Sequence, residues 1–226
     1  MRRFPPSPVK RSGAGEGGAI WSNGSDPIAI PVVRAIGKAR MDKNMLRLLQ
    51  ERLGRTAIGA STARGMGPVG TIQAARSFLQ ACDLRSIKAN TPQAYRRRLD
   101  ELTDALIERL PVDAQHWGSA RKFVNIFLRN CAYNRFMCEA YRLDRVEAWM
   151  EVPLDSHVAA GLKHDALEAN LDLTLPRWKT VIGLTPELSD SWQRVAHAIA
   201  QRGAIHRVHL DVRYWNGAHL QRQARH

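Results

Sequence analysis

The chain has 226 residues, and its 34 lysines and arginines against 21 acidic residues give a formal net charge of +13. Hydrophobic residues make up 44% and charged residues 24%, which excludes a wholly disordered, collagen-like or disulfide-rich protein. No stretch is long and apolar enough to cross a membrane, and three cysteines cannot close a disulfide framework. We expect a soluble, monomeric protein of the cytoplasm that associates with the nucleoid and has no membrane partner. Its first candidate ligand is a polyanion such as nucleic acid.

The first 40 residues differ in composition from the rest of the chain. They are rich in Pro, Gly and Ser, and their basic residues exceed the acidic ones by five, which leaves +8 on the remaining chain. This composition predicts a disordered basic arm over residues 1–40. We expect a folded helical domain over 41–217, basic enough to attract phosphate by itself, and a basic tail over 218–226.

Helical spacing of apolar residues dominates the expected domain. Thr91 followed by Pro92 is typical of a helix start, and the leucines that follow recur every three to four residues up to Pro111. A glycine-rich, exposed loop is predicted over 54–70. The alternating pattern of residues 206–214 fits either a strand or a helix. Further helices are predicted from Met41, over about 119–141, from Asp155, and from Ser189 or Asp190. The expected fold class is all-α.

A candidate phosphate site lies between Leu110 and Lys122, where one predicted helix ends and the next begins. The small residues Gly118, Ser119 and Ala120 allow a close backbone approach, and the free N–H groups of the following helix attract anions. Arg121 and Lys122 add full positive charges. The alternative is an ordinary turn between helices with solvated basic residues.

A second candidate element is Glu151–Val158, in which Pro153 stiffens the approach to a helix that begins after Asp155. An aspartate at this position caps the helix, and capping alone explains its presence. A carboxylate fixed at a helix start can also stabilise a developing positive charge.

Together these two elements resemble the helix-hairpin-helix DNA glycosylase superfamily. Gly118–Lys122 corresponds to the hairpin motif G-x-G-x-K, and Leu154–Val158 corresponds to the segment with the catalytic aspartate. The separation of 33 residues between Lys122 and Asp155 is similar to that in archaeal 8-oxoguanine glycosylases, whose base pocket holds an aspartate and a tryptophan one helical turn apart. Asp211 and Trp215 match that pair if their segment is helical. The chain departs from the motif at Ala120, which replaces the second glycine, and at His116-Trp117, which replaces the leading Pro-Gly.

The resemblance implies a two-subdomain helix-hairpin-helix glycosylase fold with its active site in the cleft between helical subdomains. Lys122 and Asp155 would be catalytic, Asp211 and Trp215 would form the base pocket, and residues 118–121 would bind the DNA backbone. Desolvation against the hairpin, together with Arg121 as a like-charged neighbour, would lower the pKa of Lys122. The iron–sulfur members' cysteine set is absent, so no iron–sulfur cluster and no metal are expected.

The implied function is DNA repair or anti-phage defence, in which a modified base is flipped out of double-stranded DNA and excised. The substrate would be 8-oxoguanine or, by likeness to anti-phage glycosylases, a glucosylated cytosine of phage DNA. The nucleophile would be water in a monofunctional enzyme, or the Lys122 amine in a bifunctional enzyme that adds abasic-site lyase activity through a Schiff base. The alternative is a helix-hairpin-helix module that binds the DNA backbone and performs no chemistry.

Overall fold

Eight α-helices and four 3-10 turns make up the structure, a computed structural model that describes residues 41–172 and 174–223. Those residues contain no strand, so the all-α prediction is confirmed for them, whereas the predicted basic arm over 1–40 lies outside them. No described helix is both long and apolar enough to cross a membrane. The helices are α1 (Lys43–Ala57), α2 (Thr71–Ala81), α3 (Pro92–Ile107), α4 (Trp117–Tyr133), α5 (Arg135–Tyr141), α6 (Ser156–Glu168), α7 (Pro186–Arg202) and α8 (Leu210–Gln223). The 3-10 turns are η1 (Val112–Ala114), η2 (Leu143–Arg145), η3 (Glu147–Trp149) and η4 (Arg207–His209).

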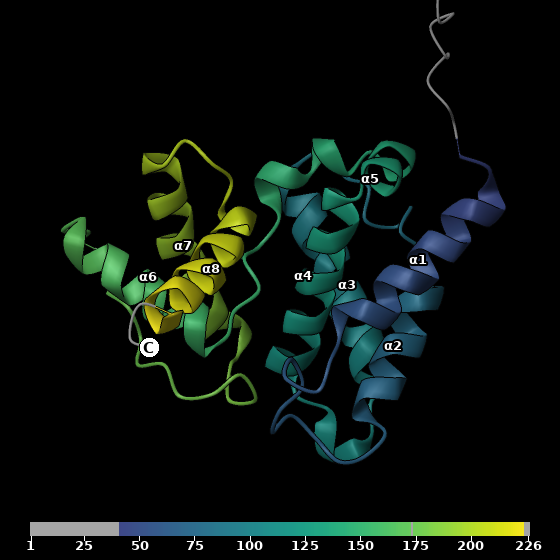
Figure 1. Cartoon of the computed structure of the whole chain (residues 1–226), viewed down its shortest axis with the longest axis horizontal. Coiled ribbons are helices and arrows are strands. Elements are labelled where there is room, and N and C mark those ends of the chain that lie inside the picture. The colour runs from purple at the N-terminus through teal and green to yellow at the C-terminus, as the bar shows by residue number, and fades with distance from the viewer. Residues whose placement is uncertain (1–40, 173, 224–226) are drawn as a thin grey trace, which may run out of the picture. The chain divides into compact units, whose positions relative to one another are not determined.

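The helices form two groups, with α1–α5 on one side and α6–α8 on the other (Figure 1). Each group has its own buried apolar cluster. Phe123 and Phe127 of α4 lie in the first cluster with Leu99 of α3, and Trp192 of α7 lies in the second with Leu162 of α6. The chain passes from the first group to the second through residues 150–155, which connect η3 to α6.

The predicted helix starts at Thr91 and Asp155 are confirmed, because each side chain accepts hydrogen bonds from the first turn of its helix. The predicted start of α7 is wrong. Thr185 caps that helix and Pro186 occupies its first position, while Ser189 lies on its buried face. The Thr-Pro pair is the same signal that starts α3.

Two further boundaries correct the sequence analysis. The helix predicted over 119–141 divides at Asn134, whose side chain accepts a hydrogen bond from the backbone N–H of Met137 and so starts α5. Gly54 belongs to α1 rather than to the glycine-rich loop. A Cβ atom there would lie 2.9 Å from the backbone nitrogen of Gln80, so the lack of a side chain lets α1 approach α2 closely. The rest of that loop is not wholly exposed, since Ile58 is completely buried.

The segment over 206–214 is helical, first as η4 and then as α8. Its buried residues Leu210, Asp211 and Tyr214 follow helical spacing, which decides the question that the alternating pattern left open. Helix α8 continues to Gln223, so the backbone stays helical beyond the expected domain end at 217.

Candidate active site

The predicted hairpin is a connection over 108–116 that contains η1, and α4 begins directly after it. Gly118, Ser119 and Ala120 lie in the first turn of α4 rather than in a turn between helices, and all three are buried. A side chain on Gly118 would lie 2.0 Å from the carbonyl oxygen of Val181, so another segment of the chain covers this helix start. These three residues are therefore not exposed in this structure, and their contact with a DNA backbone stays a prediction.

Arg121, for which a contact with DNA is predicted, is buried as well. Its guanidinium donates to both carboxylate oxygens of Glu151, at 2.9 and 3.2 Å. It also donates to Thr103 Oγ1 at 2.9 Å and to Asp100 Oδ1 at 2.7 Å. Burial alone would raise the pKa of Glu151, but the charges of Arg121, Arg207 and Arg96 outweigh it and hold that pKa below its usual value. The two side chains are almost completely buried and bind each other rather than an outside ligand.

Lys122 lines a cavity, whereas its neighbour Arg121 is paired with Glu151. Its Nζ lies 3.7 Å from Asp155 Oδ2 and donates a hydrogen bond to the carbonyl oxygen of Thr62 at 3.1 Å. Burial lowers the pKa of Lys122, and Asp155 opposes that shift only in part. Burial is therefore the cause that lowers this pKa, as the sequence predicts, whereas the charge of Arg121 is not among the causes.

The two carboxylate oxygens of Asp155 have different tasks. Oδ1 accepts hydrogen bonds from the backbone N–H groups of His157 and Val158, at 2.9 and 3.0 Å, and so caps α6. Oδ2 faces the amine of Lys122. Capping and a role in chemistry are therefore compatible, because the cap fixes the orientation in which the second oxygen meets the amine.

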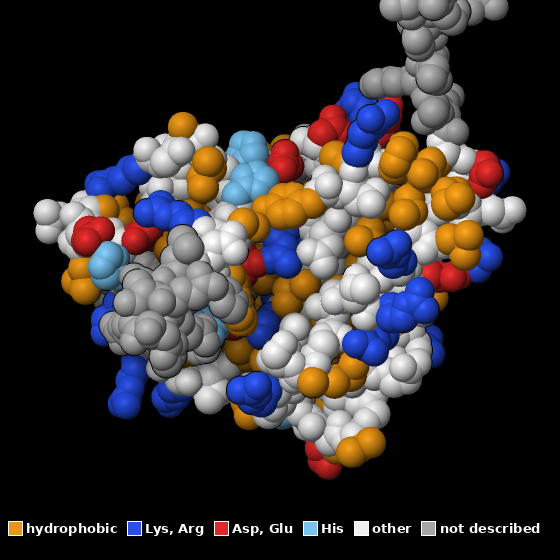
Figure 2. Space-filling view, in the orientation of Figure 1, with side chains coloured by type: hydrophobic (Ala, Val, Ile, Leu, Met, Phe, Trp, Pro, Cys, Tyr) orange, Lys and Arg blue, Asp and Glu red, His pale blue; other side chains and the backbone are white. Residues whose placement is uncertain are grey.

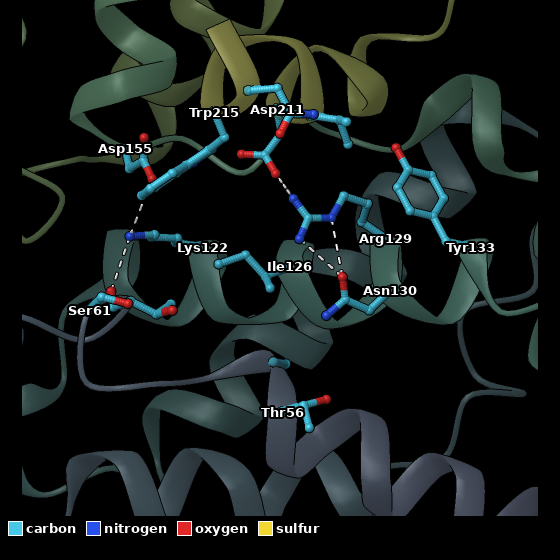
Figure 3. A pocket seen from close by; sticks show the side chains of 14 residues that line it. Thr56, Ser61, Lys122, Ile126, Arg129, Asn130, Tyr133, Asp155, Asp211 and Trp215 are labelled. Atoms are coloured by element: carbon cyan, nitrogen blue, oxygen red, sulfur yellow. Dashed lines mark hydrogen bonds and ion pairs between the residues drawn. The ribbon is translucent and has the colours of Figure 1, made fainter. Parts of the chain in front are cut away.

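Lys122 and Asp155 line a cavity of about 450 Å³. Figure 2 shows the hollow between the two groups of helices, with basic and apolar side chains visible inside it. One wall is a face of α4 and the opposite wall is the first part of α8 (Figure 3). The end of α1, the loop after it and Asp155 at the start of α6 contribute the remainder. The wall residues of α4 are Lys122, Ile126, Arg129, Asn130 and Tyr133, and those of α8 are Asp211, Val212, Trp215 and Asn216.

The structure brings all four predicted catalytic and base-pocket residues to this one cavity. Asp211 and Trp215 lie one turn apart on α8, and the indole ring of Trp215 packs on the imidazole of His157 with 4.5 Å between the ring centroids. Asp211 forms an ion pair with Arg129. Its carboxylate is therefore already engaged by a cation before any base enters the cavity.

Sequence reasoning missed Arg129, Asn130 and Tyr133 as wall residues. Asn130 Oδ1 accepts hydrogen bonds from Arg129 Nε and Nη2, at 3.3 and 3.0 Å, and so helps to orient the guanidinium toward Asp211. The signal that finds these residues is helical spacing from Lys122, because positions seven, eight and eleven residues further along a helix lie on the same face.

A metal site has little support among the described residues. His164, Asp165 and Glu168 bring ligand atoms within 4.8 Å of one another, but two of the three are exposed and none of them lines the cavity. Asp165 already accepts a hydrogen bond from Tyr214. Cys82, Cys131 and Cys138 are free thiols, and burial raises the pKa of each of them.

Comparison of the chain with protein-family models, curated proteins and solved structures gives no match. The chain is therefore assigned to no family. What supports a function is the cavity itself, with an amine of lowered pKa, a fixed carboxylate and an indole ring on its walls.

Proposed function

We propose that this chain is a DNA glycosylase of the helix-hairpin-helix type that flips a modified base out of double-stranded DNA and excises it. The observation that carries the proposal is the approach of Lys122 Nζ to Asp155 Oδ2, at 3.7 Å, in the wall of a cavity of about 450 Å³. That volume is within the range of small-molecule sites and suits a single extruded base. The net charge of +13 favours DNA as the partner.

Asp155 is the electrostatic catalyst in this proposal. Cleavage of a glycosidic bond develops positive charge on the deoxyribose as the base departs. A carboxylate that is already oriented by two backbone N–H groups needs no reorganisation to stabilise that charge. The oxygen near the Lys122 amine, Oδ2, takes no part in capping.

Lys122 is the nucleophile. Its amine must be neutral to attack, and burial favours that form. The Nζ lone pair forms a bond to C1′ while the bond from C1′ to the base breaks, and the base leaves with the electron pair and takes up a proton. The nitrogen then forms a double bond to C1′ while the bond from C1′ to the ring oxygen breaks. One amine proton goes to the departed base and the other to the ring oxygen, which becomes a hydroxyl group, and the product is a Schiff base that borohydride can reduce.

Trp215 supplies the stacking surface for the extruded base, and the Arg129–Asp211 pair supplies polar groups for its edge. We propose two substrates for the first tests, 8-oxoguanine and the glucosylated hydroxymethylcytosine of phage DNA.

The test incubates the protein with duplexes that contain 8-oxoguanine or uracil and with phage DNA that carries glucosylated cytosine, and it scores abasic sites and borohydride-trapped adducts. We expect base release and an adduct with the unaltered chain, and no adduct with Lys122→Gln. Lys163→Gln is the matched control, because this lysine is exposed on α6 and does not line the cavity. DNA binding without base release would contradict the proposal and favour a non-catalytic binding module. Such a module would show a shallower salt dependence in Lys122→Gln and no response to Asp155→Asn.

A further inference from the structure

The segment over 149–155, which carries Asp155, is held by three other parts of the chain. The side-chain amide of Gln193 in α7 forms two hydrogen bonds with the backbone of Val152. Its oxygen accepts from the N–H at 3.1 Å, and its nitrogen donates to the carbonyl oxygen at 2.8 Å. Arg207, at the start of η4, donates to the carbonyl oxygens of Met150 and Trp149 at 2.9 and 2.8 Å. The third part is α4, through Arg121.

The contact with α4 is the one that bears on the site, because Arg121 directly precedes Lys122. Arg121 and Glu151 form a bidentate ion pair in which the side chains are 2% and 1% exposed, respectively. Asn125, one turn further along α4, donates to the same carboxylate at 3.1 Å. Two residues of α4 therefore hold Glu151, four residues before Asp155, and Pro153 limits the flexibility of the chain between the two acids.

Stability alone does not explain a buried pair of this kind. Apolar residues of similar volume are often as stabilising as a buried ion pair, because charges lose their hydration when they are buried. A planar guanidinium on a carboxylate does, however, fix both distance and direction, which an apolar contact does not.

We propose that Arg121 and Glu151 are positioning residues, whose pairing sets the separation and orientation of the Lys122 amine and the Asp155 carboxylate. This inference rests on the proposed function and adds the device that aligns its two catalytic groups. Neither residue touches the substrate. The pair acts by holding the segment before α6 in register with the first turn of α4.

The experiment measures how fast borohydride traps the protein on a duplex with an aldehydic abasic site, as a function of pH. This probe needs the Lys122 amine and no particular base. The test variant is Arg121→Met with Glu151→Leu, which removes both charges and leaves neither one buried alone. Affinity for a duplex with a tetrahydrofuran abasic analogue and the thermal unfolding temperature are measured in parallel.

We expect the double variant to fold and to bind the analogue as the unaltered chain does. Its maximal trapping rate should fall about tenfold or more, because misplacement by about 1 Å can cost as much as ~10²-fold in rate. The midpoint of its pH profile should move to lower pH, because a displaced Asp155 no longer stabilises the ammonium form of Lys122. Gln50→Met is the matched control, since Gln50 is a buried polar residue that ties α1 to the carbonyl oxygen of Cys82 and does not contact residues 149–155. It should lower the unfolding temperature and leave the trapping rate unchanged.

An unchanged maximal rate and an unchanged pH midpoint in the folded double variant would overturn this inference and leave the proposed function standing. If the double variant does not fold, the same measurement on Glu151→Gln tests the inference. Glutamine keeps the shape of the side chain but can accept only one of the two hydrogen bonds from Arg121. We therefore expect the same shift of the pH midpoint and a smaller loss of trapping rate than in the double variant. No change in either quantity would overturn the inference. An unaltered chain that traps no better than Lys122→Gln would instead overturn the proposed function.

Discussion

Arg121 and Lys122 are neighbours in α4, and each meets a carboxylate of the same segment, yet the two pairs differ in kind. Arg121 has Glu151, Asp100 and Thr103 as partners, whereas Lys122 meets Asp155 at 3.7 Å beside a cavity. Successive side chains on a helix point about 100° apart, since a turn takes 3.6 residues. Adjacent cations can therefore serve structure on one face and chemistry on another.

Burial has opposite consequences in the two pairs. The arginine charges near Glu151 outweigh the effect of burial and lower its pKa, so this acid stays ionised. Burial outweighs Asp155 at Lys122 and lowers the pKa of the amine, which favours its neutral form. The environment of Glu151 therefore favours a charged carboxylate, whereas that of Lys122 favours a neutral amine.

The largest expected effect is on stability. Arg121→Met leaves the Glu151 carboxylate buried without its main partner, which should reduce the free energy of unfolding by about 3–5 kcal/mol. Lys122→Met removes a cation that burial already disfavours and should change stability little. Urea denaturation of both variants measures the difference, and equal losses would show that the two pairs are of the same kind.

A smaller effect, on rate, is expected from Asp155→Asn. Loss of one preorganised group that stabilises the transition state typically lowers the rate ~10²–10³-fold, which is about 2.7–4 kcal/mol. Single-turnover base release measures it. Asparagine caps helices as well as aspartate does, so the unfolding temperature should stay the same. A rate that survives in Asp155→Asn but falls in Asp155→Ala would indicate that only the cap matters.

Trp215→Ala should weaken recognition of the extruded base by about 1–3 kcal/mol, the usual contribution of one stacked aromatic ring. We expect the loss in affinity for a duplex with a base in place and little change for a duplex with an abasic site. Trp215→Phe keeps an aromatic face and should retain most of the affinity. Equal losses of affinity for both duplexes would show that Trp215 does not stack on the extruded base.

The smallest expected effect is the pH dependence of stability that comes from Lys122. Its folded-state pKa is below the unfolded value of 10.5, so the folded chain releases this proton first as the pH rises. The unfolded chain then binds more protons, and stability increases with pH through the window between the two pKa values. Lys122→Met should lack this increase. A variant that retains it would assign the effect to another group.

The sequence predicted the parts of the site that rest on local signals. Asp155 follows a proline-stiffened lead-in to a helix, and Asp211 and Trp215 have the spacing of one helical turn, so their places could be anticipated. The burial of Arg121 could not be anticipated, because the sequence does not show that Glu151, 30 residues away, packs against it. Arg129 was missed for a similar reason, since its carboxylate partner lies on another helix.

The face of α4 that runs from Lys122 to Tyr133 also limits changes in chain length. One residue inserted after Lys122 would turn everything beyond it by about 100° around the helix axis, and Arg129 and Tyr133 would leave the wall. The connection over 112–115 lies before the helix and is largely exposed, so extra residues there alter neither the phase of α4 nor the cavity. Residues added near the site should therefore be inserted before Trp117.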